Sequence, residues 1–124
     1  MHSRPVVLGV DIGTYEAKGV LVTPDGKVLA QHRRPHSVIT PAPGFVEHDP
    51  EATWWAGFVD ITRALLASAG DDAVAIQAIA VSGIGPCVLP VDTHGEPLRN
   101  AILYSVDSRA QAQIEHLTRA YGAD

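Results

Sequence analysis

The sequence predicts an α/β domain whose mixed sheet opens with three antiparallel strands. Two observations carry this prediction. First, an apolar run over residues 6–10 ends at Asp11, and two further strand-like runs follow it after tight turns. Second, a segment with the apolar spacing of a helix leads into another apolar run at residues 74–82. A strand that follows a crossover helix lies parallel to the earlier strand, so residues 74–82 are expected to pair in parallel with the first strand.

The first three strands are expected at residues 6–11, 17–23 and 27–34, followed by a proline-rich loop over residues 35–48. A helix is then expected to start at Asp49-Pro50-Glu51. Asp is a common N-cap, Pro suits the first turn, and an acid is favoured near the positive end of the helix. Gly70 ends this helix. Its sheet-facing side comprises Trp54, Phe58, Ile61, Leu65 and Leu66.

The remaining elements are predicted in chain order. Residues 74–82 indicate a strand buried on both faces, because such strands are continuous Val/Ile/Leu runs. Residues 88–91 predict another strand, and Pro90 within it favours an edge or a bulge. Residues 101–104 predict a short strand. A last helix, over about residues 108–121, places Ala110, Ile114, Leu117 and Tyr121 on one face, with Gly122 after it.

Composition narrows the class of protein. The chain has 124 residues, 46% of them apolar, and a net charge of −5, which argues against a nucleic-acid-binding surface. The single cysteine, Cys87, excludes an internal disulfide and fits a reducing compartment. The N-terminal apolar run is broken by Asp11 and resembles neither a signal peptide nor a membrane span. We therefore expect a cytoplasmic protein that binds neither nucleic acid nor membrane.

The turn after the first strand is the first candidate site. Gly13 lets the backbone approach a ligand, and backbone N–H groups together with the Thr14 hydroxyl suit a phosphate. Asp11 is a candidate ligand for Mg²⁺, through water, because this ion keeps much of its hydration shell. Lys18 follows four residues after Thr14. The alternative is an ordinary hairpin in which Asp11 caps the turn.

Four separated blocks resemble the FGGY family of carbohydrate kinases, in the family's order. The blocks are Leu8-Gly-Val-Asp-Ile-Gly-Thr14, Pro43-Gly-Phe-Val-Glu-His-Asp-Pro50 followed by Trp54-Trp55, Ala80-Val-Ser-Gly83, and Gly95-Glu-Pro-Leu-Arg-Asn-Ala-Ile-Leu103 with Asp107-Ser-Arg109. The resemblance favours the xylulokinase-like branch and covers residues 7–117. It covers only the first part of the family's much longer protein.

The resemblance implies an actin-like ATPase, or ribonuclease H-like, fold. Residues 1–124 would form the N-terminal portion of the first of two such domains. The implied reaction transfers the γ-phosphoryl group of ATP, with Mg²⁺, to a hydroxyl of a ketose or polyol. The ATP phosphates would contact Asp11, Gly13, Thr14, Tyr15 and Lys18. The family's catalytic aspartate lies downstream of every motif found here, so this chain alone is expected to be inactive. The alternative function is a non-catalytic actin-like module that binds a nucleotide or a partner chain.

The resemblance also implies a substrate site. Gly85 and Pro86, after Ile84, occupy the positions of a Met-His pair that contacts the sugar in xylulokinase-like members. Neither has a polar side chain, and this departure favours a substrate other than D-xylulose or glycerol. Tyr104, in place of a Trp, together with Asp107 and Arg109 would lie near the sugar. The alternatives are a plain tight loop at residues 83–87, and an Asp107 that caps the last helix while Arg109 pairs with an acid.

Other residues are expected to be structural. Five of the six histidines have no metal-ligand spacing and are expected at the surface; they are His32, His36, His48, His94 and His116. Glu47, His48 and Asp49 would form a turn into the helix. Trp54 and Trp55 would be core and boundary residues, and Cys87 a small buried one. A homodimer that covers an open sheet edge is a further partner to consider.

Overall fold

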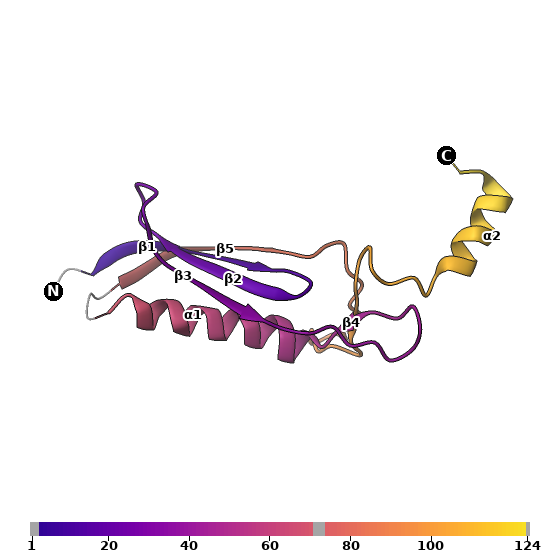
Figure 1. The fold of residues 1–124 in the computed structure, drawn as a ribbon, viewed down its shortest axis with the longest axis horizontal. Helices are drawn as coiled ribbons and strands as arrows, with labels where there is room; N and C mark the ends of the chain where they lie inside the picture. The colour runs from indigo at the N-terminus through magenta and orange to yellow at the C-terminus, as the bar shows by residue number, and fades with distance from the viewer. Residues whose placement is uncertain (1–2, 71–73, 124) are drawn as a thin grey trace.

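The sheet has the predicted strand directions. A computed structural model describes residues 3–70 and 74–123. Its four-stranded sheet has the order β3-β2-β1-β5, drawn in Figure 1. The strands are β1 (Arg4–Ile12), β2 (Glu16–Val22), β3 (Val28–Pro35) and β5 (Val74–Gly83). β2 pairs antiparallel with β1 and β3, whereas β5 pairs parallel with β1. These pairings confirm the predicted mixed sheet.

The register of β1 and β5 sets the position of the candidate site. Asp11 pairs with Ser82, and Ile12 pairs with Gly83, at the carboxyl ends of both strands. β1 lies inside the sheet, between β2 and β5. The predicted parallel pairing therefore brings Asp11 and Gly83 to the same end of the sheet.

The helix begins where the sequence predicts. Asp49 is the N-cap, and its Oδ1 accepts hydrogen bonds from the backbone N–H groups of Glu51 (2.9 Å) and Ala52 (2.9 Å). A π-helical segment, η1 (Pro50–Trp55), leads into α1 (Ala56–Ser68). Gly70 follows with a left-handed φ of 71°, as a helix-ending glycine does.

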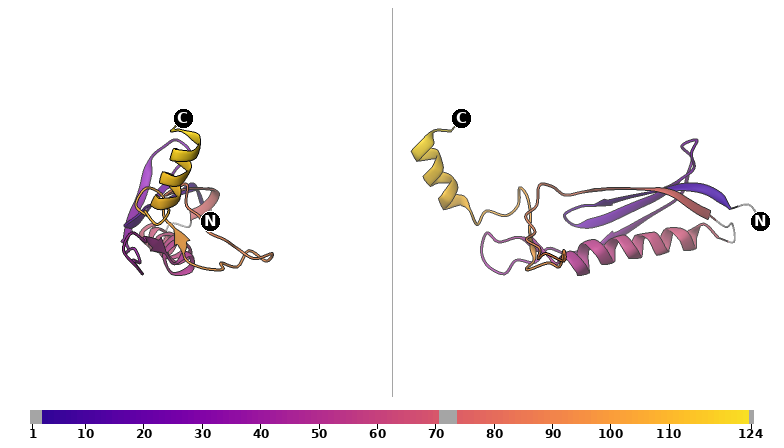
Figure 2. Two further views of the ribbon diagram at one scale, coloured as in Figure 1. Left: turned by 90° about the vertical axis from the view of Figure 1, so that its right-hand side faces the viewer. Right: turned by 180° about the vertical axis from the view of Figure 1, so that it is seen from behind.

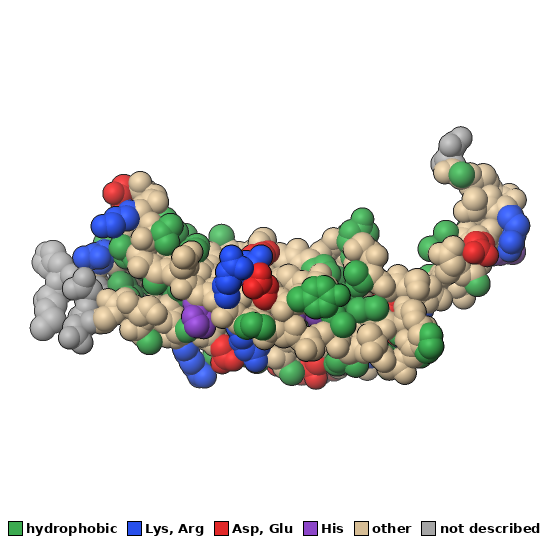
Figure 3. Space-filling model, in the orientation of Figure 1, with side chains coloured by type: hydrophobic (Ala, Val, Ile, Leu, Met, Phe, Trp, Pro, Cys, Tyr) green, Lys and Arg blue, Asp and Glu red, His purple; other side chains and the backbone are tan. Residues whose placement is uncertain are grey.

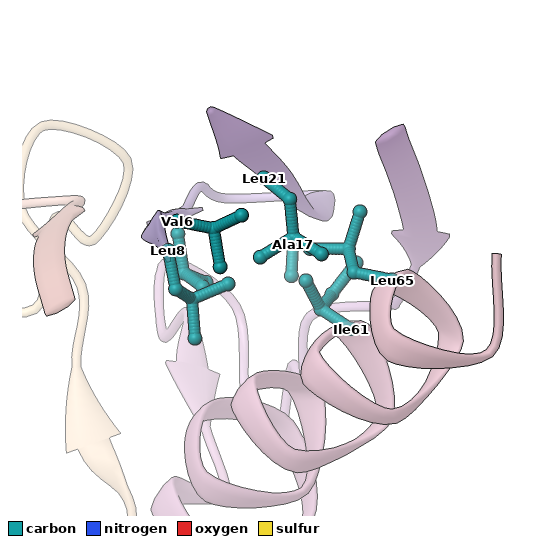
Figure 4. Close-up of a cluster of buried hydrophobic side chains, with 7 residues drawn as sticks. Val6, Leu8, Ala17, Leu21, Ile61 and Leu65 are labelled. Atoms are coloured by element: carbon teal, nitrogen blue, oxygen red, sulfur yellow. The ribbon is translucent and has the colours of Figure 1, made fainter. Parts of the chain in front are cut away.

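The core lies between α1 and one face of the sheet. Figure 4 shows its side chains pointing from the strands and from the helix into the space between them. Its buried members are Val6, Leu8, Val10, Ala17, Leu21, Ile61 and Leu65. One predicted member of the helix face is wrong: Leu66 is 38% exposed. Trp55, expected with Trp54 among the core and boundary residues, is 60% exposed. Leu66 follows Leu65 directly, and one residue turns the helix by about 100°, so both cannot face the sheet.

The prediction that the strand at residues 74–82, which is β5, is buried on both faces is wrong. In β5, Ile79 and Val81 are 56% and 59% exposed. β5 is an edge strand in the described part of the chain, and α1 packs mainly on β1, β2 and β3. An apolar strand sequence indicates that both faces can be buried. Whether they are buried depends on which other elements pack on them, and the described residues leave Ile79 and Val81 exposed.

A second, two-stranded sheet joins β4 (Glu47–His48) to β6 (Ala101–Ile102) in antiparallel pairing. The predicted loop over residues 35–48 therefore ends in a short strand. The predicted strand at residues 88–91 is wrong: Val88 and Val91 form only isolated bridges, to Ile102 and Pro97. Pro90 has no N–H to donate to a ladder, which explains the interruption.

The last helix, α2 (Gln111–Tyr121), begins three residues later than predicted and stands apart from the sheet in Figures 1 and 2. None of its described residues is buried. The predicted apolar face is exposed at Ile114, Leu117 and Tyr121, to 55%, 54% and 84%. Neither α1 nor α2 has the length and hydropathy of a membrane-spanning helix.

Charges of both signs share the surface. On the face that Figure 3 shows, basic side chains lie next to acidic ones. Glu16 pairs with Lys18 (3.2 Å) and Arg33 (3.2 Å), and Arg34 pairs with Asp60 (3.0 Å). Exposed pairs of this kind contribute little to stability, about 1 kcal/mol or less each.

Candidate functional site

The turn between β1 and β2 sits at the carboxyl end of β1. The Gly13 N–H donates to the Glu16 carbonyl (2.9 Å) and closes the hairpin. A Cβ on residue 13 would lie 3.1 Å from that carbonyl oxygen, so the close backbone approach favours glycine. Asp11, just before the turn, accepts a 2.7 Å hydrogen bond from the Ser82 hydroxyl. Lys18 lies directly opposite Asp11 in the register of β1 and β2. Asp11, Lys18 and Ser82 line one open depression of the sheet.

Three consecutive carbonyls of this turn accept hydrogen bonds from residues far along the chain. His36 Nε2 contacts the Gly13 oxygen at 2.9 Å, and the His36 backbone N–H donates to the Tyr15 oxygen at 2.9 Å. His48 Nε2 contacts the Thr14 oxygen at 3.0 Å. Because a carbonyl oxygen only accepts, both ring nitrogens must be donors here.

The predicted surface position of His48 is wrong. It is fully buried rather than at the surface, and His36 is half-buried. Trp54 Nε1 donates to His48 Nδ1 at 3.0 Å, which explains why Trp54 lies at the boundary of the core. The partners of the two histidines on the turn are 23 and 34 residues away in the sequence. Spacing along the chain therefore could not reveal them.

Two N–H groups of the turn have no acceptor among the described residues. Within residues 3–70 and 74–123, the backbone N–H groups of Thr14 and Tyr15 donate no hydrogen bond. The Tyr15 side chain is 61% exposed. Two adjacent free N–H groups can donate hydrogen bonds to an anion, as successive backbone donors do in phosphate-binding turns.

The loop after β5 continues the same edge of the sheet. The Ile84 N–H donates to the Ile12 carbonyl at 2.8 Å, so the loop leaves β5 beside the end of β1. Ile12, Trp54, Gly83 and Ile84 share a pocket of about 250 Å³ with Val81 and Ser82. Cys87 is half-buried rather than buried, and its thiol contacts the Ile84 carbonyl at 3.5 Å.

The substrate-site residues fall into separate places. Gly85 has open space around its α-carbon. Tyr104 is 52% exposed, and no hydrogen bond among the described residues joins it to the loop at residues 83–87. The contacts of Ile84, Gly85, Pro86 and Tyr104 with a sugar stay predictions.

Asp107 and Arg109 form part of a buried ion-pair network. Arg109 Nη2 lies 2.7 Å from Asp107 Oδ2 and 2.8 Å from Glu47 Oε1, and the three side chains are 15% exposed or less. Asp107 also accepts the Val46 N–H at 2.7 Å, and the Arg109 guanidinium lies 4.1 Å from the centre of the Phe45 ring. The network joins the segment before α1 to the segment before α2.

This geometry excludes one of the alternatives for Asp107. α2 begins at Gln111 behind Ala110, with no side-chain cap, so Asp107 does not cap it. Arg109 does pair with acids, as the structural alternative predicts. A sugar hydroxyl would compete with Arg109 and Val46 for the Asp107 oxygens. The role of Asp107 and Arg109 in substrate binding stays a prediction.

The network predicts acid sensitivity. The Arg109 hydrogen bond lowers the pKa of Asp107 from 3.8 to about 2. Since the folded state holds the proton less tightly than the unfolded state, this carboxylate stabilises the fold fully above about pH 4 and progressively less as the pH falls towards 2. Urea unfolding between pH 2 and 5 should show the slope, and Asp107→Asn should flatten it. An unchanged slope in the variant would contradict this assignment.

The described residues hold no group of three or more His, Cys, Asp or Glu side chains placed to bind a metal ion. Mg²⁺ bound with a nucleotide commonly uses one or two carboxylates, several waters and the substrate's phosphates. One Asp11 oxygen accepts from Ser82, while no described residue donates to the other. Asp11 therefore fits a single-carboxylate contact to Mg²⁺.

The fold and this edge of the sheet match a known class of protein. The chain belongs to the FGGY family of carbohydrate kinases, because the model of that family's N-terminal domain matches residues 6–124. Its fold is accordingly the actin-like ATPase type, of which it holds a part.

Curated relatives and a solved structure agree with this class. The chain is 33% identical over 119 residues to a glycerol kinase of Beutenbergia cavernae, and 31% identical over 116 residues to a xylulose kinase of Bacillus subtilis. These alignments cover 95% and 94% of this chain but 23% of each relative. The crystal structure of a xylulose kinase from Rhodospirillum rubrum superimposes with a TM-score of 0.83 at 32% identity, over 93% of this chain and 23% of that one. The chain thus spans about a quarter of the length of its relatives.

Proposed function

We propose that residues 1–124 are the N-terminal portion of the first actin-like domain of an ATP-dependent carbohydrate kinase. The rest of that domain and the second domain would belong to the same longer protein. The support is the family match together with the 23% of each relative that this chain spans. The kinase names of these relatives do not favour the alternative of a non-catalytic module.

One observation carries the nucleotide assignment. The free N–H groups of Thr14 and Tyr15 lie at the carboxyl end of β1, where the register also places Asp11. Lys18, on β2, supplies a positive charge at the same end of the sheet. Ligands of open α/β sheets bind outside the carboxyl ends of the strands. We assign this turn, with Gly13, to the ATP phosphates.

The proposed reaction transfers the γ-phosphoryl group to a hydroxyl of a ketose or polyol. When bound, Mg²⁺ would neutralise charge on the phosphates, with Asp11 holding it through water. The turn would hold the phosphates, and the loop at residues 84–86 with Tyr104, Asp107 and Arg109 would face the sugar. The general base that accepts the hydroxyl proton would come from the longer protein, at no position in this chain.

The substrate would be neither glycerol nor D-xylulose by preference. Gly85 and Pro86 offer no side-chain hydrogen bond, and a site that lacks such partners loses the discrimination they supply. We also propose that the kinase works in the cytoplasm. A homodimer that covers a sheet edge stays part of the proposal.

The first test is a phosphorylation assay. The full-length protein should consume ATP in the presence of a ketose or polyol from a panel of pentuloses, hexoses and polyols, ranked by kcat/KM. The 124-residue chain should give no sugar-dependent turnover, because it lacks the general base and positioning of all parts is required. Turnover by the purified 124-residue chain would contradict the proposed division of the site. A clear preference for glycerol or D-xylulose would contradict only the proposed substrate.

A further inference from the structure

The two histidines behind the Gly13–Tyr15 turn have no role in the proposed chemistry so far. Among the described residues, they nevertheless supply the donors for the three carbonyls of the turn: two imidazoles and the His36 backbone N–H. Imidazole is an uncommon choice for this purpose, since backbone donors or water serve most turn carbonyls. The placement of two rings behind one turn therefore calls for an explanation.

Peptide geometry links these carbonyls to the free N–H groups. In a trans peptide, the carbonyl of one residue and the N–H of the next lie in one plane and point in opposite directions. The Gly13 carbonyl held by His36 thus sets the direction of the Thr14 N–H. The Thr14 carbonyl held by His48 sets that of the Tyr15 N–H. Both N–H groups are directed away from the histidines.

His48 is itself fixed from two sides. Indole N–H groups only donate, so His48 Nδ1 accepts from Trp54 while Nε2 donates to Thr14. The ring is therefore the neutral Nε2–H tautomer, and it cannot turn without breaking one of the two bonds. The His36 ring packs edge-on against it, with ring centres 5.0 Å apart.

Burial keeps His48 in this state. Desolvation lowers the pKa of His48, the Thr14 carbonyl raises it, and the neighbouring His36 lowers it again. His36 Nδ1 is buried, with no hydrogen-bond partner among the described residues. His48 therefore donates to the turn as a neutral ring at neutral pH.

We propose that His48, assisted by His36, is a positioning residue for the nucleotide: His48 orients the Tyr15 N–H group, and His36 the Thr14 N–H group, towards the phosphates. This inference rests on the proposed function. Groups fixed before binding lose less freedom when the ligand arrives, so the effect should appear in nucleotide affinity.

The test compares variants of the full-length protein by calorimetric titration with MgADP. His48→Phe keeps a ring but removes both hydrogen bonds, and we expect it to weaken MgADP binding roughly tenfold. His48→Gln keeps an amide N–H close to the position of Nε2, and we expect it to stay within about threefold of the wild type. The sugar KM should change little in either variant.

A matched control separates positioning from general stability. Leu65→Ala opens a cavity in the core between α1 and the sheet, so it should lower the melting temperature without removing a hydrogen bond from the turn. We expect its MgADP affinity to equal that of the wild type. Equal MgADP affinity of His48→Phe and the wild type, or equal weakening by Leu65→Ala and His48→Phe, would overturn the inference alone. Failure of the wild-type protein to bind MgADP would overturn the proposed function, and the inference with it.

A spectroscopic measurement tests the tautomer independently of the nucleotide. Imidazole ¹⁵N spectra should show His48 as a neutral ring protonated at Nε2 from pH 6 to 8. Protonation of His48 at Nδ1 in this range would overturn the inference, because the ring could not then accept from Trp54.

Discussion

Asp11→Ala in the full-length protein should lower kcat by at least about 100-fold, a loss comparable to removal of a group that stabilises charge in the transition state. Asp11 lies at the carboxyl end of β1 and is the carboxylate that we propose contacts Mg²⁺. Its orientation is set by the 2.7 Å hydrogen bond from Ser82. The measurement is ATP turnover at saturating sugar, at several Mg²⁺ concentrations.

Two further variants make the Asp11 result specific. Ser82→Ala keeps the carboxylate but frees its orientation, so we expect a smaller loss, about tenfold. Asp25→Asn changes a carboxylate at the β2–β3 turn, the opposite end of β2 from the site, and should leave kcat unchanged. If Asp11→Ala retains more than a tenth of the wild-type kcat, the proposed metal contact is wrong.

Local sequence signals predicted most of the fold. The apolar runs at β1 and β2, the turns between strands and the Asp49 cap each depend on residues close together in the chain. The parallel pairing of β5 followed from a general rule about crossovers rather than from any single residue. The predictions of exposure failed where they depended on packing partners: Val81 on β5 and Ile114 on α2 are apolar but uncovered in the described residues.

The sequence predicted only part of the candidate site, because contacts between residues far apart in the chain leave no local signal. The positions of Asp11 and Gly83 followed from strand direction. His48 did not, because its role arises from contacts with Thr14 and Trp54 that no spacing rule describes. Asp107 was expected to cap a helix or to face a sugar; it does not cap α2, and it binds Arg109 and the Val46 N–H, while Glu47 shares that arginine. Short polar motifs indicate which residues are unusual and leave their partners undetermined.

Gly19→Ala should destabilise the fold by about 2–3 kcal/mol, the cost of adding a methyl group to a core with no room for it. Gly19 lies on β2 and faces α1. A Cβ there would overlap Ile61 Cγ2 and come within 3.0 Å of Leu65 Cδ1. Ile61 is β-branched and fully buried, so its side chain has little freedom to move aside. The measurement is urea unfolding of the chain, followed by circular dichroism.

Gly57→Ala is a control with the opposite expected effect on the free energy of unfolding. A Cβ on Gly57 would lie 3.6 Å from the Ala17 Cβ, an ordinary contact, and Gly57 is inside α1, where alanine is favoured over glycine by up to about 1 kcal/mol. Gly57→Ala should therefore stabilise the chain. A mutant cycle completes the argument: in an Ile61→Ala background the overlap is gone, so Gly19→Ala should lose most of its effect. If Gly19→Ala costs as much with Ile61→Ala as without it, close packing of α1 on β2 is not the cause.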